Sequence, residues 1–504
     1  MLRKRSEKNN KCALDQIIEA LSAGDLSAVR YVCGALASCP ADMAEKILPV
    51  LSRVFASAGA SEICALDSNL RSWVCWRKGD VKRIIGKCAN LDEQRSVLFA
   101  ATFAGSGYVR QYAVEQLAYF PGAISYIALR CNDWVQAVRQ SAYSSLAAAV
   151  SRAPDDELTE ALPMFEKLRR SKRGDYPAIK ELLLREVGRR PGYIQKVLES
   201  ADIIIRKYCL SSLADPTEDR DVIIRHISHE RDPFLRYLCF EALKDNMPEG
   251  VMEMFLNDRF PGNRIKALQH LYKRNQHQAL GRAKEALLSP NSGVRSVAQF
   301  IVRKCEPDTD LRAFYLRVLN NAASKSLQGC IGGLGENGAP EDSRTLEAYL
   351  GHSSASIAAS AMSAVMNLDH KRYSARIAEM LVSESPAVSK TAYRLLLKYK
   401  CTDFEQIFEM YRASADENTR CRCASLLFSE SKWQQLMYAL ILLDDSSEKV
   451  RSASVRQIDS WMLKFNNSYA VLSDEQRNII IDLINQSTHL DDKIRSELKF
   501  LARK

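Results

Sequence analysis

Two histidines and a glutamate lie within five residues at His226-Ile-Ser-His229-Glu230. On a helix, residues three apart share one face, so the two imidazoles could bind a metal ion together. The only further ligands nearby in sequence are Glu230 and Asp232, and only seven histidines occur in the chain. We therefore interpret the segment as a solvated helix end before the Asp232-Pro233 turn, and we expect no metal and no other cofactor.

A glycine-rich segment, Gly333-Leu-Gly335-Glu-Asn-Gly338, matches the G-x-G-x-x-G pattern of dinucleotide-binding loops. Such a loop follows a strand and opens a helix, so that its amide groups can bind a pyrophosphate. Here the glycines end an expected helix inside a regular repeat. Close helix packing and a helix C-terminus explain them better than phosphate binding.

Basic residues gather at two places in the N-terminal half. Residues 71–87 contain six Lys and Arg against Asp80 alone, with Trp73 and Trp76 between them. Residues 166–196 contain ten Lys and Arg against four acids and supply +6 of the formal net charge of +10. The candidate contacts to a polyanion or other partner are Arg77, Lys78, Lys82, Arg83, Arg169, Arg170, Lys172, Arg173, Arg189 and Arg190.

These two clusters have a functional and a structural interpretation. Clustered Lys and Arg attract a polyanion with salt-dependent affinity, and tryptophans can stack on bases, so nucleic acid is a candidate partner. Charge runs on helices are more often solvated faces, and Trp73 and Trp76, three residues apart, more often belong to a core. Both interpretations stay open from the sequence.

One short pattern recurs along the chain: an apolar residue, then Arg or a substitute, two residues of any kind, then Ala, Cys or Ser. Its second position falls, at steps of 31 or 32 residues, on Arg264, Arg295, Leu327, Ala358, Ser389, Arg420 and Arg451. Earlier copies place Arg30, Arg110, Arg139, Arg206 and Arg236 there. We call an arginine at this position a motif arginine.

The motif arginines could bind a ligand, but a residue repeated in every copy usually serves what all copies share, which is stacking. Acids lie a few residues upstream of several of them. We expect Asp25, Asp133 and Asp202 to pair with such arginines, within or between copies.

The repeat predicts an all-α protein. In the copy around Arg295, residues 280–288 form an expected first helix, and Val294, Val297 and Ala298 mark the apolar face of the second. Helices this short cannot bury their apolar faces alone, so the copies must stack into a right-handed α-solenoid. Further helices are expected over 41–55, 66–77 and 80–88.

The pattern also suggests where the chain divides. We expect a flexible basic tail at 1–11, an N-terminal cap with diverged helical repeats at 12–105, and the repeat array at 106–504. Within the array, 166–196 is a basic irregular unit, and 264–480 holds the most regular repeats.

From about residue 100 the chain resembles the short HEAT-like repeats named after phycobilisome lyases. The stretch Gly332 to Asp342 is similar to a helix end and turn of that family. The phrase Val-Arg-x-x-Ala, which begins at Val109 and at Val294, is similar to the start of the second helix in the family's repeat. The resemblance implies an armadillo-like superhelix of stacked two-helix repeats. Related superhelical DNA glycosylases would use a Trp and an Asp, for which Asp133 and Trp134 are candidates, although both also fit a helix N-cap and a packing position.

Targeting and cysteine chemistry point to a cytoplasmic protein. The N-terminal residues are basic, but residues 12–21 contain Asp15, Gln16 and Glu19, unlike a signal peptide. No stretch reaches the roughly 18 apolar residues of a membrane span. The fourteen cysteines include no CxxC pair, and we expect reduced packing residues. Five of the cysteines lie three residues after the pattern's second position, where other copies have Ala or Ser: Cys33, Cys209, Cys239, Cys330 and Cys423.

The predicted function is a non-enzymatic scaffold that binds a protein partner on its concave surface. No nucleophile, base and orienting group are recognisable together, so we assign no catalytic residue. The alternative, from a different class, is a nucleic-acid-binding or DNA-repair superhelix that uses the basic N-terminal half.

Overall fold

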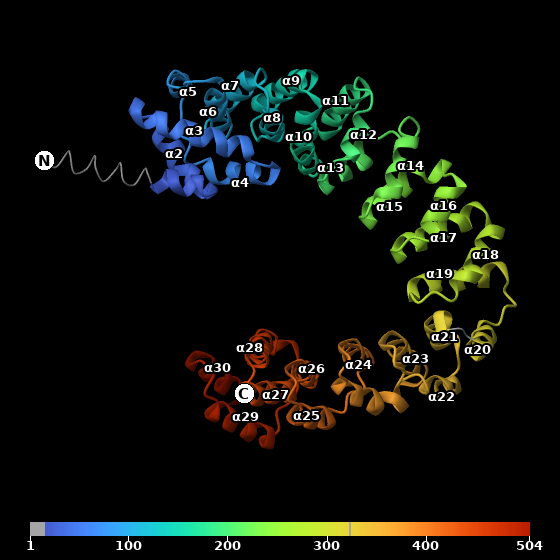
Figure 1. Ribbon diagram of the computed structural model, residues 1–504. Helices are drawn as coiled ribbons and strands as arrows, with labels where there is room; N and C mark the ends of the chain where they lie inside the picture. Colours follow the sequence, from blue (N-terminus) through green and yellow to red (C-terminus); the bar gives the residue numbers. More distant parts are fainter. Residues whose placement is uncertain (1–15, 322–323, 504) are drawn as a thin grey trace. The chain divides into compact units, whose positions relative to one another are not determined.

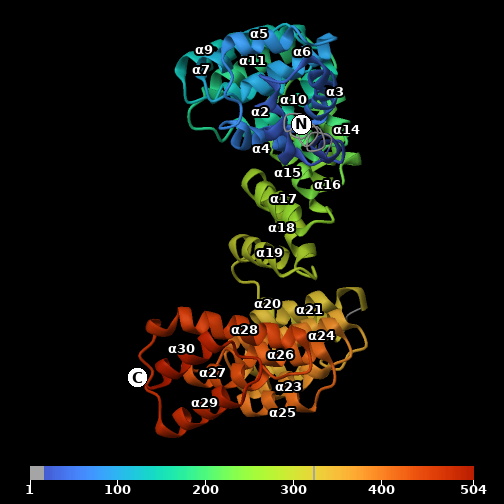
Figure 2. The same ribbon diagram turned by 90° about the vertical axis from the view of Figure 1, so that its left-hand side faces the viewer.

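The computed structural model describes residues 16–321 and 324–503, and every regular element in this part of the chain is a helix. The predicted all-α class is therefore confirmed. The chain divides into an N-terminal unit (Met1–Val251) and a C-terminal unit (Met252–Lys504). Within each unit, successive short helices pack side by side (Figures 1 and 2). The basic tail predicted at 1–11 lies outside the described residues.

Thirteen helical pairs follow one another in the described residues from Leu91 onward. The first helices are α6 (Leu91–Thr102), α8 (Ile124–Arg130), α10 (Asp155–Leu168), α12 (Tyr193–Leu198), α14 (Arg220–His229), α16 (Glu249–Leu256), α18 (Gln276–Ala286), α20 (Leu311–Asn320), α22 (Ser343–Glu347), the second half of α23 (Ala355–Glu379), α25 (Phe404–Ala413), α27 (Lys432–Leu442) and α29 (Asp474–Gln486). The second helices are α7 (Gly107–Leu117), α9 (Gln136–Arg152), α11 (Tyr176–Gly188), α13 (Ile203–Tyr208), α15 (Pro233–Leu243), α17 (Pro261–Arg274), α19 (Ser292–Cys305), α21 (Ser324–Asn337), the first half of α23, α24 (Pro386–Tyr399), α26 (Glu417–Leu427), α28 (Glu448–Leu463) and α30 (Asp492–Arg503). The two halves of α23 meet at Asp369, whose backbone is extended (φ −152°, ψ 74°). The predicted stack of two-helix repeats is confirmed; its handedness stays a prediction.

Before these pairs lie helical residues 16–22, the short η1 (Leu26–Ala28) and the helices α2 (Val29–Leu36), α3 (Ala41–Ser57), α4 (Ala60–Leu70) and α5 (Lys78–Ile85). The helix expected over 66–77 is wrong, because α4 begins earlier and ends at Leu70. Gly59 is extended and donates its N–H to the Glu62 carboxylate, which fixes the start of α4. After α4 the chain turns, and the Val74 carbonyl accepts a hydrogen bond from the N–H of Gly105.

The small residue that closes each copy of the pattern lies in the core. Each of these side chains is 0% exposed, and they are Cys33, Ala113, Ala142, Cys209, Cys239, Ala267, Ala298, Cys330, Ala361, Ala392, Cys423 and Ser454. The five cysteines among them are free thiols, as predicted. Burial raises the pKa of Cys33 to about 12, as expected for an unreactive packing residue. In the C-terminal unit one apolar cluster runs from Leu268 to Val450 without a break between pairs.

The glycine-rich segment forms the C-terminal end of α21, with Gly338 just beyond it, and serves helix packing. A Cβ atom at Gly333 would lie 2.2 Å from the Tyr315 ring, and one at Gly335 would lie 2.5 Å from the Ala364 side chain. No strand precedes this helix in the described residues. The close-packing interpretation is confirmed, and the geometry of a dinucleotide loop is not present here.

Candidate functional site

The motif arginines bind the turn that precedes their own helix. Arg110 Nη1 donates to the carbonyls of Ala104 and Gly105 at 2.8 and 2.9 Å, which are the residues six and five positions before it. The same pair of bonds is made by Arg206, Arg236, Arg295 and Arg451. These carbonyls would otherwise lack partners in the turn. For these five arginines, the predicted structural role is to close the turn before their own helix.

The residue six positions before the motif position adds a second recurring contact. Its side chain accepts a hydrogen bond from the backbone N–H two residues later, so we call it the turn acceptor. The turn acceptors are Asp133, Ser200, Glu230, Asp258, Ser289, His352, Ser383, Ser414 and Asp445. The turn acceptor was not predicted from the sequence, although the spacing of the pattern shows that Asp, Glu or Ser occupies this position in most copies.

Acidic turn acceptors also join one pair to the previous one. Arg110 Nε and Nη2 each lie 2.8 Å from the Asp133 carboxylate of the next pair. Arg206 Nε lies 2.9 Å from Glu230 in the same way. In the C-terminal unit, Arg420 Nη2 lies 3.4 Å from Asp445. In Arg110 and Arg206 the guanidinium thus closes its own turn with one nitrogen and binds the next turn with the others.

Of the three acids predicted to pair with motif arginines, only Asp133 does so. It binds Arg110, which lies in the preceding helical pair. The Asp25 and Asp202 side chains instead accept the backbone N–H groups of Ser27 and Ile204. A carboxylate that caps a helix start in this way has its oxygens directed at the backbone, which explains the difference.

Asp133 lies at the centre of a buried ionic network. Its side chain and that of Arg110 are 0% exposed, and Arg130 Nη1 lies 3.0 Å from the same carboxylate. Arg130 in turn binds Asp67 at 2.5 Å, which ties α4 to the later pairs. Burial opposes ionisation of Asp133, but its hydrogen bonds and the two arginines outweigh burial and lower its pKa.

This network also bears on the glycosylase candidate residues. The Asp133 carboxylate is enclosed by Arg110 and Arg130, so it cannot reach a bound substrate. Trp134 is about half exposed, and its ring lies 3.8 Å from the Arg71 guanidinium carbon. Both residues therefore have structural partners, in agreement with the packing interpretation. The N-cap interpretation is wrong, because the N-cap residue of α9 is Val135.

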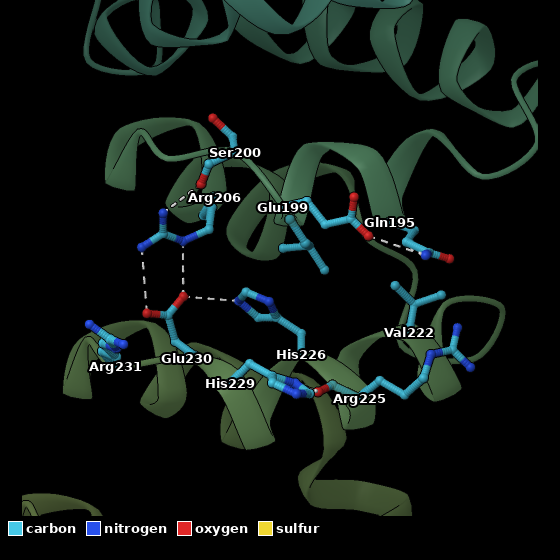
Figure 3. A pocket seen from close by; sticks show the side chains of 11 residues that line it. Gln195, Glu199, Ser200, Arg206, Val222, Arg225, His226, His229, Glu230 and Arg231 are labelled. Carbon is cyan, nitrogen blue, oxygen red and sulfur yellow. Dashed lines mark hydrogen bonds and ion pairs between the residues drawn. The ribbon is translucent and has the colours of Figure 1, made fainter.

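A pocket of about 560 Å³ lies between α12 and α14 in the N-terminal unit (Figure 3). Arg206 and Glu230 face each other on one side, with the His226 ring beside them. Glu199 and Arg225 line the other side. Because Arg206, His226 and Glu230 are bound to one another, the pocket presents hydrogen-bonding groups rather than a free base or nucleophile.

The histidines do not form a metal site. His226 Nε2 lies 3.0 Å from Glu230, and His229 Nδ1 lies 3.1 Å from the carbonyl of Arg225. Burial lowers the pKa of His226, although the Glu230 charge opposes this effect. No group of three metal-binding side chains occurs in the residues that the structure covers. The predicted solvated helix end holds for exposed His229 but is wrong for His226, which is mostly buried.

Parts of the two basic clusters lie at turns that precede second helices, along what we call the turn edge of the N-terminal unit: residues 71–77, 103–106, 131–135, 169–175 and 199–202. Neighbouring turns touch. Arg71 stacks on Trp134, and the N–H of Arg173 donates to Asn132 Oδ1. The turn edge holds five of the ten candidate residues: Arg77, Arg169, Arg170, Lys172 and Arg173. The other five lie on α5 (Lys78, Lys82, Arg83) or directly after α11 (Arg189, Arg190).

Half of the ten candidate basic residues are engaged within the protein. Arg83 binds Asp80, Arg169 lies near Glu166, Arg189 binds Glu186, Arg190 binds Asp155, and Lys78 lies over the Tyr112 ring. The other five are exposed and form no side-chain hydrogen bond or ion pair within the described residues: Arg77, Lys82, Arg170, Lys172 and Arg173. A polyanion could contact only this second group without breaking an existing ion pair or ring contact.

The two tryptophans of the first cluster have different environments. Trp76 is 3% exposed and donates its indole N–H to the Cys33 carbonyl at 3.0 Å, as expected for a core residue. Trp73 is 41% exposed and packs edge-on against Tyr31. The core assignment is confirmed for Trp76 and wrong for Trp73.

No helix in the described part of the chain has the length and apolar character needed to span a bilayer.

No family model matches the chain, and no curated protein matches it. Among solved structures, importin beta is similar at 10% identity and a TM-score of 0.34, over 98% of this chain and 66% of that one. Kap121p bound to Ste12p is similar at 12% identity and a TM-score of 0.35, over 98% and 74% of the two chains. Free Kap121p, at 12% identity and a TM-score of 0.30, is covered over only 57% of its length. Likeness at this level does not identify the family or the function of this chain.

Proposed function

We propose that this chain is a non-enzymatic, HEAT-like repeat scaffold that binds an extended protein partner on the surface of its second helices. In a solenoid, stacked repeats present such an extended surface on the concave side. The lyase-type subclass of repeat and a cytoplasmic location are part of the same proposal. Buried free thiols such as Cys209 and Cys239 suit a reducing compartment.

The observation that carries the proposal is a row of exposed apolar side chains at the starts of second helices in the N-terminal unit. Tyr108, Ile204 and Phe234 each lie two positions before a motif arginine and are 84%, 43% and 49% exposed. Trp134, 53% exposed, lies in the turn just before α9. Exposed aromatic and aliphatic side chains that recur at one place in several repeats are typical of a protein-binding surface. Lys207, whose Nζ lies 6.0 Å from the Phe234 ring, places a cation beside this row.

We expect the triple variant Tyr108→Ser, Ile204→Ser, Phe234→Ser to lose the protein partner without unfolding. These side chains are exposed, so their loss removes little packing and should leave Tm nearly unchanged. The measurement is affinity capture from native lysate after nuclease treatment, followed by titration of the captured protein. A loss of affinity of at least tenfold is expected, because exposed aromatic anchors carry much of the binding energy.

The matched control is Leu91→Ser with Tyr119→Ser, which removes apolar side chains that are 69% and 77% exposed and lie away from this row. This control should keep the partner. If the triple variant and the control bind the partner equally well, the row at the starts of the second helices is not the binding surface.

A second candidate function is the binding of nucleic acid by the turn edge, favoured by its four free basic side chains, Arg77, Arg170, Lys172 and Arg173. The variant Arg170→Ser, Lys172→Ser, Arg173→Ser should weaken DNA or RNA binding and flatten its salt dependence, because fewer counterions are released. Gel-shift titrations between about 50 and 200 mM salt measure both effects. The control Lys371→Ser, Lys390→Ser, Arg394→Ser makes the same charge change in the C-terminal unit. Equal behaviour of the two variants, or no binding by the wild type, would remove this candidate.

A further inference from the structure

One motif arginine differs from the others in having no partner for its guanidinium. Arg264 lies on α17, and its Nε atom is buried without a hydrogen bond. The Nε atoms of Arg30 and Arg420 share this feature, but their guanidinium groups keep another partner, the Tyr31 hydroxyl and the Asp445 carboxylate. Its side chain forms no hydrogen bond or ion pair within the described residues, whereas Arg206 and Arg295 each bind two carbonyls and a carboxylate. A buried donor without an acceptor is costly, and it marks a place where a ligand can be bound.

The partner is missing because the next turn acceptor is a serine. Arg110, Arg206 and Arg420 each face an acidic turn acceptor, 23, 24 and 25 residues further along the chain. The corresponding residue for Arg264 is Ser289, 25 residues further on and 8% exposed. Its hydroxyl accepts the Asn291 N–H at 3.3 Å, so it closes its own turn but does not reach the arginine.

The space that a carboxylate would occupy is a pocket of about 230 Å³, lined by both Arg264 and Ser289. Leu256, Leu268 and Val294 contribute apolar walls. This volume suits one side chain rather than a larger ligand.

The charges around the pocket limit what it can bind. Arg282 lies on its rim but is already bound to Glu253 at 2.6 Å and to Glu285 at 3.0 Å. Arg264 is thus the cation left for a ligand, and the two glutamates oppose a doubly charged anion such as a phosphate. A singly charged carboxylate would balance the single positive charge of Arg264. It is also the group that faces Arg110, Arg206 and Arg420.

We propose that this pocket binds the carboxylate of an aspartate or glutamate side chain supplied by a protein partner. That side chain would take the place that Asp133, Glu230 and Asp445 take for the other motif arginines. The source of the carboxylate rests on the proposed protein-binding function, but the site itself can be tested without any partner.

The test uses N-acetyl-glutamate N-methylamide as the probe and N-acetyl-glutamine N-methylamide as its neutral match. Binding to the full chain is measured by saturation-transfer NMR. The wild type should bind the glutamate probe and not the glutamine probe. Ser289→Asp should fill the site from within, so we expect at least tenfold weaker probe binding and a rise in Tm of about 3 °C.

The control is Ser383→Asp, which introduces the same acid at a turn acceptor whose preceding motif position is Ala358. With no arginine facing it, this acid should not raise Tm and should leave probe binding intact. Arg264→Gln should also abolish probe binding.

Three results would overturn the proposal. They are equal binding of the two probes, full probe binding by Ser289→Asp, or displacement of the probe by inorganic phosphate at lower concentration than by acetate. Because no partner protein is present, failure here is separate from failure of the capture experiment with the Tyr108 triple variant.

Discussion

Replacing Asp133 by alanine is expected to lower the free energy of unfolding of the N-terminal unit by about 3 to 5 kcal/mol. The substitution leaves the side chains of Arg110 and Arg130 buried, at 0% and 2% exposure, without the carboxylate that both of them bind. An uncompensated buried cation costs far more than the loss of one surface ion pair. Urea unfolding of the full chain, followed by circular dichroism, measures the change as an early transition.

The same carboxylate should make the N-terminal unit sensitive to acid. The pKa of Asp133 is lower in the folded chain than its ordinary value of 3.8. Its contribution to stability is therefore complete above about pH 4 and is lost as the pH falls through the lowered pKa. In Asp133→Asn this part of the acid dependence should disappear.

Asp156→Ala is the control for both measurements. Asp156 is 79% exposed and binds exposed Lys196 at 2.8 Å, so its loss should leave the unfolding curve and its pH dependence unchanged. A similar loss of stability in the two alanine variants would contradict the special role of the buried network.

Replacing Gly329 by alanine is expected to destabilise the C-terminal unit by about 3 kcal/mol. A Cβ atom at Gly329 would lie 1.9 Å from the carbonyl oxygen of Leu288, which belongs to the backbone and cannot move as a side chain can. Helix α21 would have to shift away from the preceding pair, and this shift would separate packed apolar surfaces. Calorimetric melting should show a lower Tm for the C-terminal unit.

Gly281 offers a matched control on α18. A Cβ atom there would meet nothing within 4 Å, and the residue lies in the interior of the helix. Gly281→Ala should therefore stabilise the same unit by roughly 0.5 to 1 kcal/mol, through the lower backbone entropy of alanine in the unfolded chain. A destabilising effect at Gly281, or a neutral effect at Gly329, would contradict the packing described here.

The period of the sequence was enough to predict the architecture. The apolar positions around Arg295 and the small residues three positions after each motif arginine mark the buried face of the second helix, and both occupy the core as expected. Element boundaries near the N-terminus were less predictable. The start of α4 depends on a capping contact between Gly59 and Glu62. Because of this contact, the helix begins at Ala60 and not at residue 66, where the apolar pattern had placed its start.

The candidate site was less predictable than the fold, because its contacts join residues of different pairs. The structural role of the motif arginines could be predicted because the arginine recurs in most copies. Their true acceptors, two carbonyls and an acid 23 to 25 residues further on, depend on how turns stack in space. Arg264 shows the same limit, since its free guanidinium results from a serine in the next pair.

The turn that a motif arginine closes has a consequence for how such a chain can grow. In the copy around Arg295, only seven residues hold all parts of the turn: the turn acceptor Ser289, the helix cap Asn291 and Arg295 itself. A duplicated segment of DNA would therefore carry a complete turn with it and need no matching change elsewhere. Ion pairs such as Arg110 with Asp133 are different, since they fix which copy follows which. At Ala358 and Ser389 the motif arginine is absent, so there the array can gain or lose whole copies without breaking an ion pair of this kind. The copy around Leu327 also lacks the arginine, but its Glu336 binds Arg295 of the preceding pair.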